Sequence, residues 1–93
     1  MPTFNTDHAQ TNLRWCARAW KDGEMRDLAL FLFRKAIGQL TMADISFDVQ
    51  VEIVAAYIGR EAAEDLYKYN EEVQNNEVAC KAWQSRINCL IVC

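Results

Sequence analysis

The sequence has few of the residues and motifs that enzymes and metal proteins use. It contains one histidine, His8, and no P-loop, no dinucleotide-binding glycine triplet and no metalloprotease helix motif. Its four cysteines form no Cys-x-x-Cys pair, and a transition-metal site needs several Cys or His ligands that converge. Neighbouring acids such as Glu64 and Asp65 point in different directions on a helix, so they form no catalytic dyad. We therefore expect a non-enzymatic protein with no cofactor and no metal site.

Long apolar segments and targeting signals are also missing. An uninterrupted apolar run such as residues 28–33 is far shorter than the roughly 20 residues that span a membrane. The first seven residues contain no basic segment followed by an apolar stretch, so no secretory signal is visible. Nothing besides the even number of cysteines suggests a disulfide-rich secreted scaffold. We expect a cytoplasmic protein that does not bind membranes, with most of its thiols buried.

The chain is short and has no low-complexity stretch, one proline and three glycines. Ninety-three residues predict a single domain over residues 1–93, with residues 1–6 as a flexible N-terminal tail. The apolar fraction of 52% is slightly above the roughly 45–50% of soluble domains. This excess is compatible with a well-filled core. It also suggests a dimer or a docking face for a partner.

Apolar residues recur at three- and four-residue spacing through most of the chain, which predicts helices over residues 7–22, 24–37, 60–73 and 77–92. Gly23, Gly38 and Gly59 stand where three helices are expected to end. The second segment is apolar nearly all round, which predicts a central, buried helix. Its apolar residues are Met25, Leu28, Phe31, Leu32 and Ile37, with Leu30 and Phe33 on the other side.

Residues 41–58 fit two structures. Apolar and polar residues alternate from Ile45 to Ile53, as in a strand, but Phe47, Val51 and Val54 also share one helical face. A helix with Ser46 as its N-cap is favoured, because no other alternating segment is present to pair with a strand. The predicted fold is an all-α compact bundle of four to five short helices. The alternative is an α+β fold with a small hairpin between residues 45–53 and 87–92.

Charge is unevenly distributed along the chain. Residues 1–40 carry a net charge of +2, residues 41–79 carry −7, and residues 80–93 carry +2. A negative surface of this size attracts a basic partner and repels phosphates. The simpler interpretation is a solvated face that confers solubility. The candidate partner-binding residues are Glu61, Glu64, Asp65, Tyr69, Glu71 and Glu72.

These features indicate a small acidic interaction module that blocks or bridges a partner macromolecule, such as a phage-type inhibitor of a bacterial defence complex. The expected partner is a protein with a basic surface, and a homo-oligomer is compatible with the composition. A second hypothesis is a nucleic-acid-binding regulator, because Arg14, Arg18 and Lys21 share a helical face beside Trp15. The net acidity opposes it. A third is an oligomeric protein that sequesters a small ligand.

Overall fold

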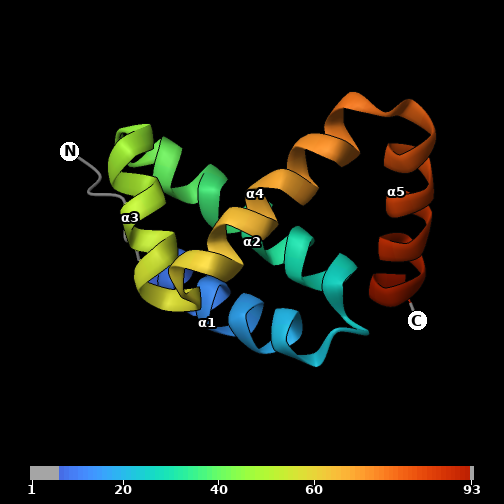
Figure 1. The fold of residues 1–93 in the computed structure, drawn as a ribbon, viewed down its shortest axis with the longest axis horizontal. Coiled ribbons are helices and arrows are strands. Elements are labelled where there is room, and N and C mark those ends of the chain that lie inside the picture. The colour runs from blue at the N-terminus through green and yellow to red at the C-terminus, as the bar shows by residue number, and fades with distance from the viewer. Residues whose placement is uncertain (1–6, 93) are drawn as a thin grey trace.

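The computed structural model describes the backbone of residues 7–92 and the side chains of residues 7–89. The expected N-terminal tail, residues 1–6, lies outside this part. The described chain contains no strand, which confirms the predicted all-α class. It folds into five helices (Figure 1): α1 (Asp7–Asp22), α2 (Arg26–Met42), α3 (Phe47–Ile58), α4 (Arg60–Asn75) and α5 (Glu77–Val92).

Helix α2 is the centre of the bundle, as its all-round apolar sequence predicts. It runs back along α1 after a short turn and also contacts α3, α4 and α5. Helix α4 crosses in front of α2 in Figure 1, and α5 lies at the far end from α3. Helix α2 is therefore in contact with all four other helices and packs most extensively against α1.

Helix α2 is apolar nearly all round, and the structure buries one part of that surface more deeply than the rest. Its buried side chains are Ala29, Leu30, Phe33, Ala36 and Leu40. The other apolar residues of this segment are less covered: Leu28, Phe31, Leu32 and Ile37 are half-buried, and Met25 is exposed. Periodicity cannot choose between faces when apolar residues surround the helix, so the packing of the neighbouring helices decides. The other helices complete the core with Ala9, Leu13, Cys16, Ala19, Val54, Ala63, Leu66, Val73, Trp83 and Ile87.

Two of the three glycines lie at helix ends. Gly23 follows α1 with φ +76°, and Gly59 separates α3 from α4 with φ +91° and ψ 149°. The prediction that Gly38 ends a helix is wrong, because α2 continues through it to Met42. A glycine inside a helix costs about 1 kcal/mol relative to alanine. Continuing the helix carries Leu40, which is 1% exposed, into the core, and that burial outweighs the cost.

The ambiguous segment forms helix α3, and the hairpin alternative is wrong because residues 77–92 are also helical. Ser46 occupies the N-cap position with extended backbone, but its side chain makes no capping hydrogen bond. The buried Gln50 instead holds the first turn of α3. Its Nε2 donates to the carbonyl oxygen of Ile45 at 2.7 Å and to Thr41 Oγ1 at 3.1 Å. These bonds fix how α3 leaves the end of α2.

The start of α5 is capped by a side chain. The backbone N–H of Ala79 donates to Asn76 Oδ1 at 3.1 Å, which satisfies one of the unpaired donors of the first turn.

The described cysteines have different surroundings. Cys16 is buried, and this burial raises the pKa of its thiol to about 12. Cys80 is half-buried and Cys89 is exposed, whereas Cys93 lies outside the described residues. We expected most of the thiols to be buried. Among the described cysteines, this holds for Cys16 alone.

Within the described residues, no helix combines the length and the apolar character that crossing a membrane requires.

The two glycines at positions 59 and 38 give opposite predictions for substitution by alanine. A Cβ would meet no atom within 4 Å at either site, so backbone conformation alone decides. Gly59→Ala should lower the free energy of unfolding by about 1–3 kcal/mol, because its φ and ψ are accessible essentially to glycine only. Gly38→Ala should raise it by about 0.5–1 kcal/mol, because Gly38 is helical. Urea denaturation followed by circular dichroism measures both, and equal stability of the two variants would contradict this reading.

Candidate functional site

Helix α4 has one apolar and one acidic face. Ala63, Leu66 and Val73 are buried against the other helices. The predicted acids recur on the opposite side at spacings of three, four and seven residues, which places them in one row. All five are exposed, and we call them the acidic stripe: Glu61, Glu64, Asp65, Glu71 and Glu72. Lys68 is also exposed and lies within this row, so the face as a whole stays strongly negative.

The carboxylates of the acidic stripe form no ion pair with any described residue. The salt bridges of the described chain lie elsewhere and join Arg60 to Glu52 at 3.7 Å, Lys81 to Glu77 at 3.4 Å, and Arg86 to Asp27 at 2.6 Å. The negative charge of the stripe is therefore directed to solvent, and none of its carboxylates is paired with a basic side chain of the described residues.

Tyr69, the sixth candidate residue, lies differently from the acids. Its side chain is half-buried at the border between the stripe and the core, and its hydroxyl donates to Asp27 Oδ1 at 2.5 Å. Burial and the nearby carboxylate of Asp27 both raise the pKa of Tyr69. Tyr69 thus joins α4 to α2, and its hydroxyl is already engaged within the protein.

Asp27 is a meeting point of three helices. Besides the bond from Tyr69, it accepts hydrogen bonds from Arg86 on α5, from Nε to Oδ2 at 2.6 Å and from Nη2 to Oδ1 at 3.3 Å. Trp83 Nε1 donates to the backbone oxygen of the same residue at 3.2 Å. One residue in the first turn of α2 therefore positions both α4 and α5.

Sequence reasoning did not identify Asp27 or its partners. Asp27 is one acid among several in a mixed segment, and Arg86 is 59 residues away along the chain. The one available signal was an acid in the first turn of a predicted helix, where the positive end of the helix dipole favours it. That signal indicates the acid but gives no information about Tyr69 or Arg86.

The carboxyl of Asp27 has a lowered pKa. Partial burial by itself raises it, but the hydrogen bonds from Arg86 and Tyr69 and the positive charge of Arg86 outweigh burial and bring it below its usual value. Asp27 is therefore held in its charged form, which the two donors require.

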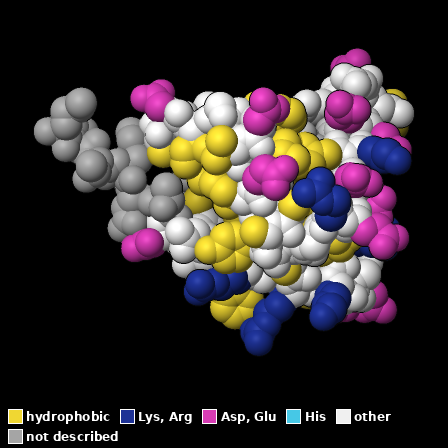
Figure 2. All heavy atoms as spheres, turned by 60° about the vertical axis from the view of Figure 1, so that its left-hand side comes forward, with side chains coloured by type: hydrophobic (Ala, Val, Ile, Leu, Met, Phe, Trp, Pro, Cys, Tyr) yellow, Lys and Arg dark blue, Asp and Glu magenta, His cyan; other side chains and the backbone are white. Residues whose placement is uncertain are grey.

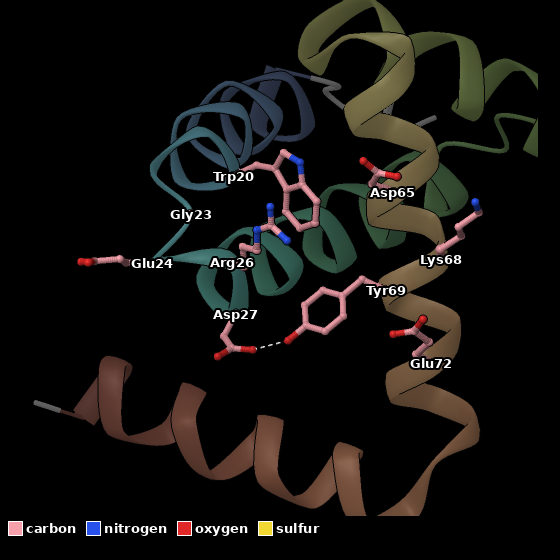
Figure 3. Close-up of a pocket in the computed structure, with 9 residues that line it drawn as sticks. All are labelled: Trp20, Gly23, Glu24, Arg26, Asp27, Asp65, Lys68, Tyr69 and Glu72. Carbon is pink, nitrogen blue, oxygen red and sulfur yellow. Dashed lines mark hydrogen bonds between the residues drawn. The ribbon is translucent and has the colours of Figure 1, made fainter.

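A hollow of about 570 Å³ adjoins the acidic stripe (Figure 3). We call it the α2–α4 groove, since it lies between the turn that precedes α2 and one side of α4. In Figure 3, Asp65 is directed toward Trp20 and Lys68 is directed away from it. The lining residues are Trp20, Gly23, Glu24, Arg26, Asp27, Asp65, Lys68, Tyr69 and Glu72.

The groove combines aromatic rings with carboxylates. The rings of Trp20 and Tyr69 have centroids 6.3 Å apart, and the guanidinium carbon of Arg26 lies 4.6 Å from the Trp20 centroid. The carboxylates of Asp65 and Glu72 border the α4 side. Ring faces and carboxylates both attract cations, and Arg26 already uses one ring face in this way. This chemistry suits basic side chains better than anionic ligands.

The basic residues of α1 lie on a different part of the surface. Arg14, Arg18 and Lys21 are exposed. The guanidinium carbon of Arg14 lies 5.8 Å from the ring centroid of Tyr57, and that of Arg18 lies 5.5 Å from the ring centroid of Trp15. Figure 2 shows a face on which carboxylates lie mostly over the upper and right-hand parts, while basic side chains lie along the lower edge and also among the carboxylates on the right.

The described residues include no group of three or more His, Cys, Asp or Glu side chains that could hold a metal ion. His8 is exposed in the first turn of α1. No protein-family model, curated protein or solved structure matches this chain significantly. The function is therefore inferred from the surface chemistry of the described residues.

The junction at Asp27 predicts a pH-dependent effect of substitution. Asp27→Asn should lower the free energy of unfolding at pH 7 by about 1–2 kcal/mol, because it removes the charge from the hydrogen bonds of Arg86 and Tyr69. A lowered folded-state pKa gives a stabilisation that is fully present above about pH 5 and disappears as pH falls through that pKa. The difference between wild type and variant should therefore shrink toward pH 2–3.

Urea denaturation at both pH values measures this effect. Asp65→Asn is the matched control, because Asp65 is exposed and forms no salt bridge among the described residues, and its stability should stay at the wild-type value. A loss at Asp27 that is the same at both pH values would show that the charge of Asp27 contributes nothing.

Proposed function

We propose that this chain is a non-enzymatic interaction module that binds a basic surface of a partner protein through the acidic stripe of α4, and so blocks or bridges that partner. The observation that carries the proposal is the row of five solvent-facing carboxylates without an ion pair among the described residues. A face of this kind attracts a positively charged surface, speeds the encounter and disfavours acidic partners.

The α2–α4 groove supports the same proposal. Interfaces depend most on a few side chains that enter a pocket near their centre, and arginine is enriched among them. The groove lies directly beside the stripe, since Asp65 and Glu72 belong to both. A lysine or arginine of the partner would place its stem against Trp20 and its charge between these two carboxylates. The stripe would then steer the encounter, and the groove would hold one anchoring side chain.

Charge reversal within the stripe tests the proposal. The tagged Glu64→Lys/Glu71→Lys chain should capture much less of the partner from a nuclease-treated lysate of the native host than the wild-type chain does. The control is Glu52→Lys/Glu77→Lys, which changes the net charge equally on α3 and α5. It also breaks two exposed salt bridges, to Arg60 and Lys81, and such pairs contribute little to stability. With the captured partner, the stripe variant should associate at least about tenfold more slowly at low salt and lose much of the salt dependence.

Equal capture by the wild-type chain and the stripe variant would show that the stripe serves solvation only. An equal loss in both variants would show that net charge acts without a defined site. Disappearance of all captured protein after nuclease treatment would favour the basic residues of α1 and a nucleic-acid partner instead.

A further inference from the structure

A second hollow lies on the outer side of the α1–α2 pair, away from the α2–α4 groove. Its volume is about 390 Å³, and we call it the α1–α2 groove. It shares no lining residue with the α2–α4 groove or with the acidic stripe. One wall comes from α1 and the other from the start of α2: Trp15, Arg18, Ala19, Asp22, Met25, Leu28 and Leu32.

This groove exists because α2 is apolar on more than one side. The core uses the side with Leu30 and Phe33, which leaves Leu28 and Leu32 half-buried on the outer side. Trp15 stands at the groove with 55% of its surface exposed, and Met25 with 37%. Large apolar side chains gathered around a hollow mark an interaction site on a protein of this size.

The groove has the length of two helical turns. Trp15 is seven residues before Asp22, and Leu32 is seven residues after Met25, so each wall extends about 10 Å from the turn between the helices. Farther from the turn, Asn12 Nδ2 donates to Gln39 Oε1 at 3.0 Å and joins the two helices. The tryptophan therefore lies at the far end of the groove, and Asp22 and Met25 lie at the turn end.

We propose that a second copy of this chain covers the α1–α2 groove. The two copies are related by a two-fold axis, so that Trp15 of each copy enters the turn end of the groove of the other. Each site is incomplete alone, because the tryptophan that fills it comes from the partner copy. A two-fold interface requires such a self-complementary patch, with a projecting group and a recess on the same face.

The charges at the groove are complementary to those of a second copy. Arg18 and Asp22 line the groove one helical turn apart, and neither forms a salt bridge with a described residue. A two-fold arrangement brings Arg18 of one copy against Asp22 of the other, and the reverse pair forms at the same time. A partner helix with charges of one sign would pair with one of these residues and repel the other.

The dimer leaves the acidic stripe uncovered, because the two surfaces share no residue. The inference therefore stands independently of the proposed function. If both hold, the dimer presents two acidic stripes, and a bivalent binder gains avidity for a partner with repeated basic sites.

Sedimentation equilibrium of the full chain tests the proposal directly. Reducing conditions exclude disulfides through exposed cysteines such as Cys89. We expect a reversible monomer–dimer equilibrium. Trp15→Glu should raise the dissociation constant at least about thirtyfold, as expected for a central tryptophan. The matched control is Val78→Glu, which places the same charge at a site on α5 that is 78% exposed and away from the groove, and it should leave the constant unchanged.

Charge exchange identifies the pairing between copies. Arg18→Asp and Asp22→Arg should each weaken the dimer, and the double variant should restore most of the affinity, because each reversed charge then meets its opposite on the other copy. Thermal unfolding of each variant checks that the monomer still folds. Three results would overturn the proposal: a wild-type chain that stays monomeric, an assembly larger than a dimer, or a dimer that Trp15→Glu does not weaken.

Discussion

The structure depends on the burial of one helix by four others. Helix α2 supplies Leu30, Phe33 and Leu40 to a core that α1, α3, α4 and α5 complete. Among the described residues, no second layer of helices covers the remaining apolar side of α2. Leu28 and Leu32 therefore stay half-buried at the surface. The need to bury one central helix thus produces both the core and the groove that we assign to a second copy.

The first turn of α2 adds a polar constraint to this packing. The carboxylate of Asp27 accepts hydrogen bonds from Tyr69 on α4 and Arg86 on α5. Apolar contacts have no preferred direction, whereas these hydrogen bonds are directional and tie both helices to the start of α2. The Tyr69 bond acts together with the buried apolar face of α4, so that Tyr69 faces inward and the acidic stripe faces outward. The junction at Asp27 therefore borders the proposed binding face and helps to orient it.

The two proposed surfaces divide the molecule by chemistry. The acidic stripe is exposed and charged, as expected of a face that binds a partner transiently and with an association rate that depends on salt. The α1–α2 groove is apolar with one charge of each sign, as expected of contacts between copies. In the α2–α4 groove, the guanidinium of Arg26 lies over the ring of Trp20. This contact shows how a basic side chain can occupy the groove beside the stripe.

Local periodicity was enough to predict most of the helices and the positions of the acids. Spacing placed α1 and α5 at their observed bounds and put Glu61, Glu64 and Glu71 in one row, because local periodicity decides which residues share a helix face. Tertiary structure decided the rest. It selected the buried side of α2, carried that helix through Gly38, and joined Asp27 to Arg86, because each of these results depends on residues far away in the chain. Nothing within α2 distinguishes its two apolar sides, and only the neighbouring helices make one of them the core.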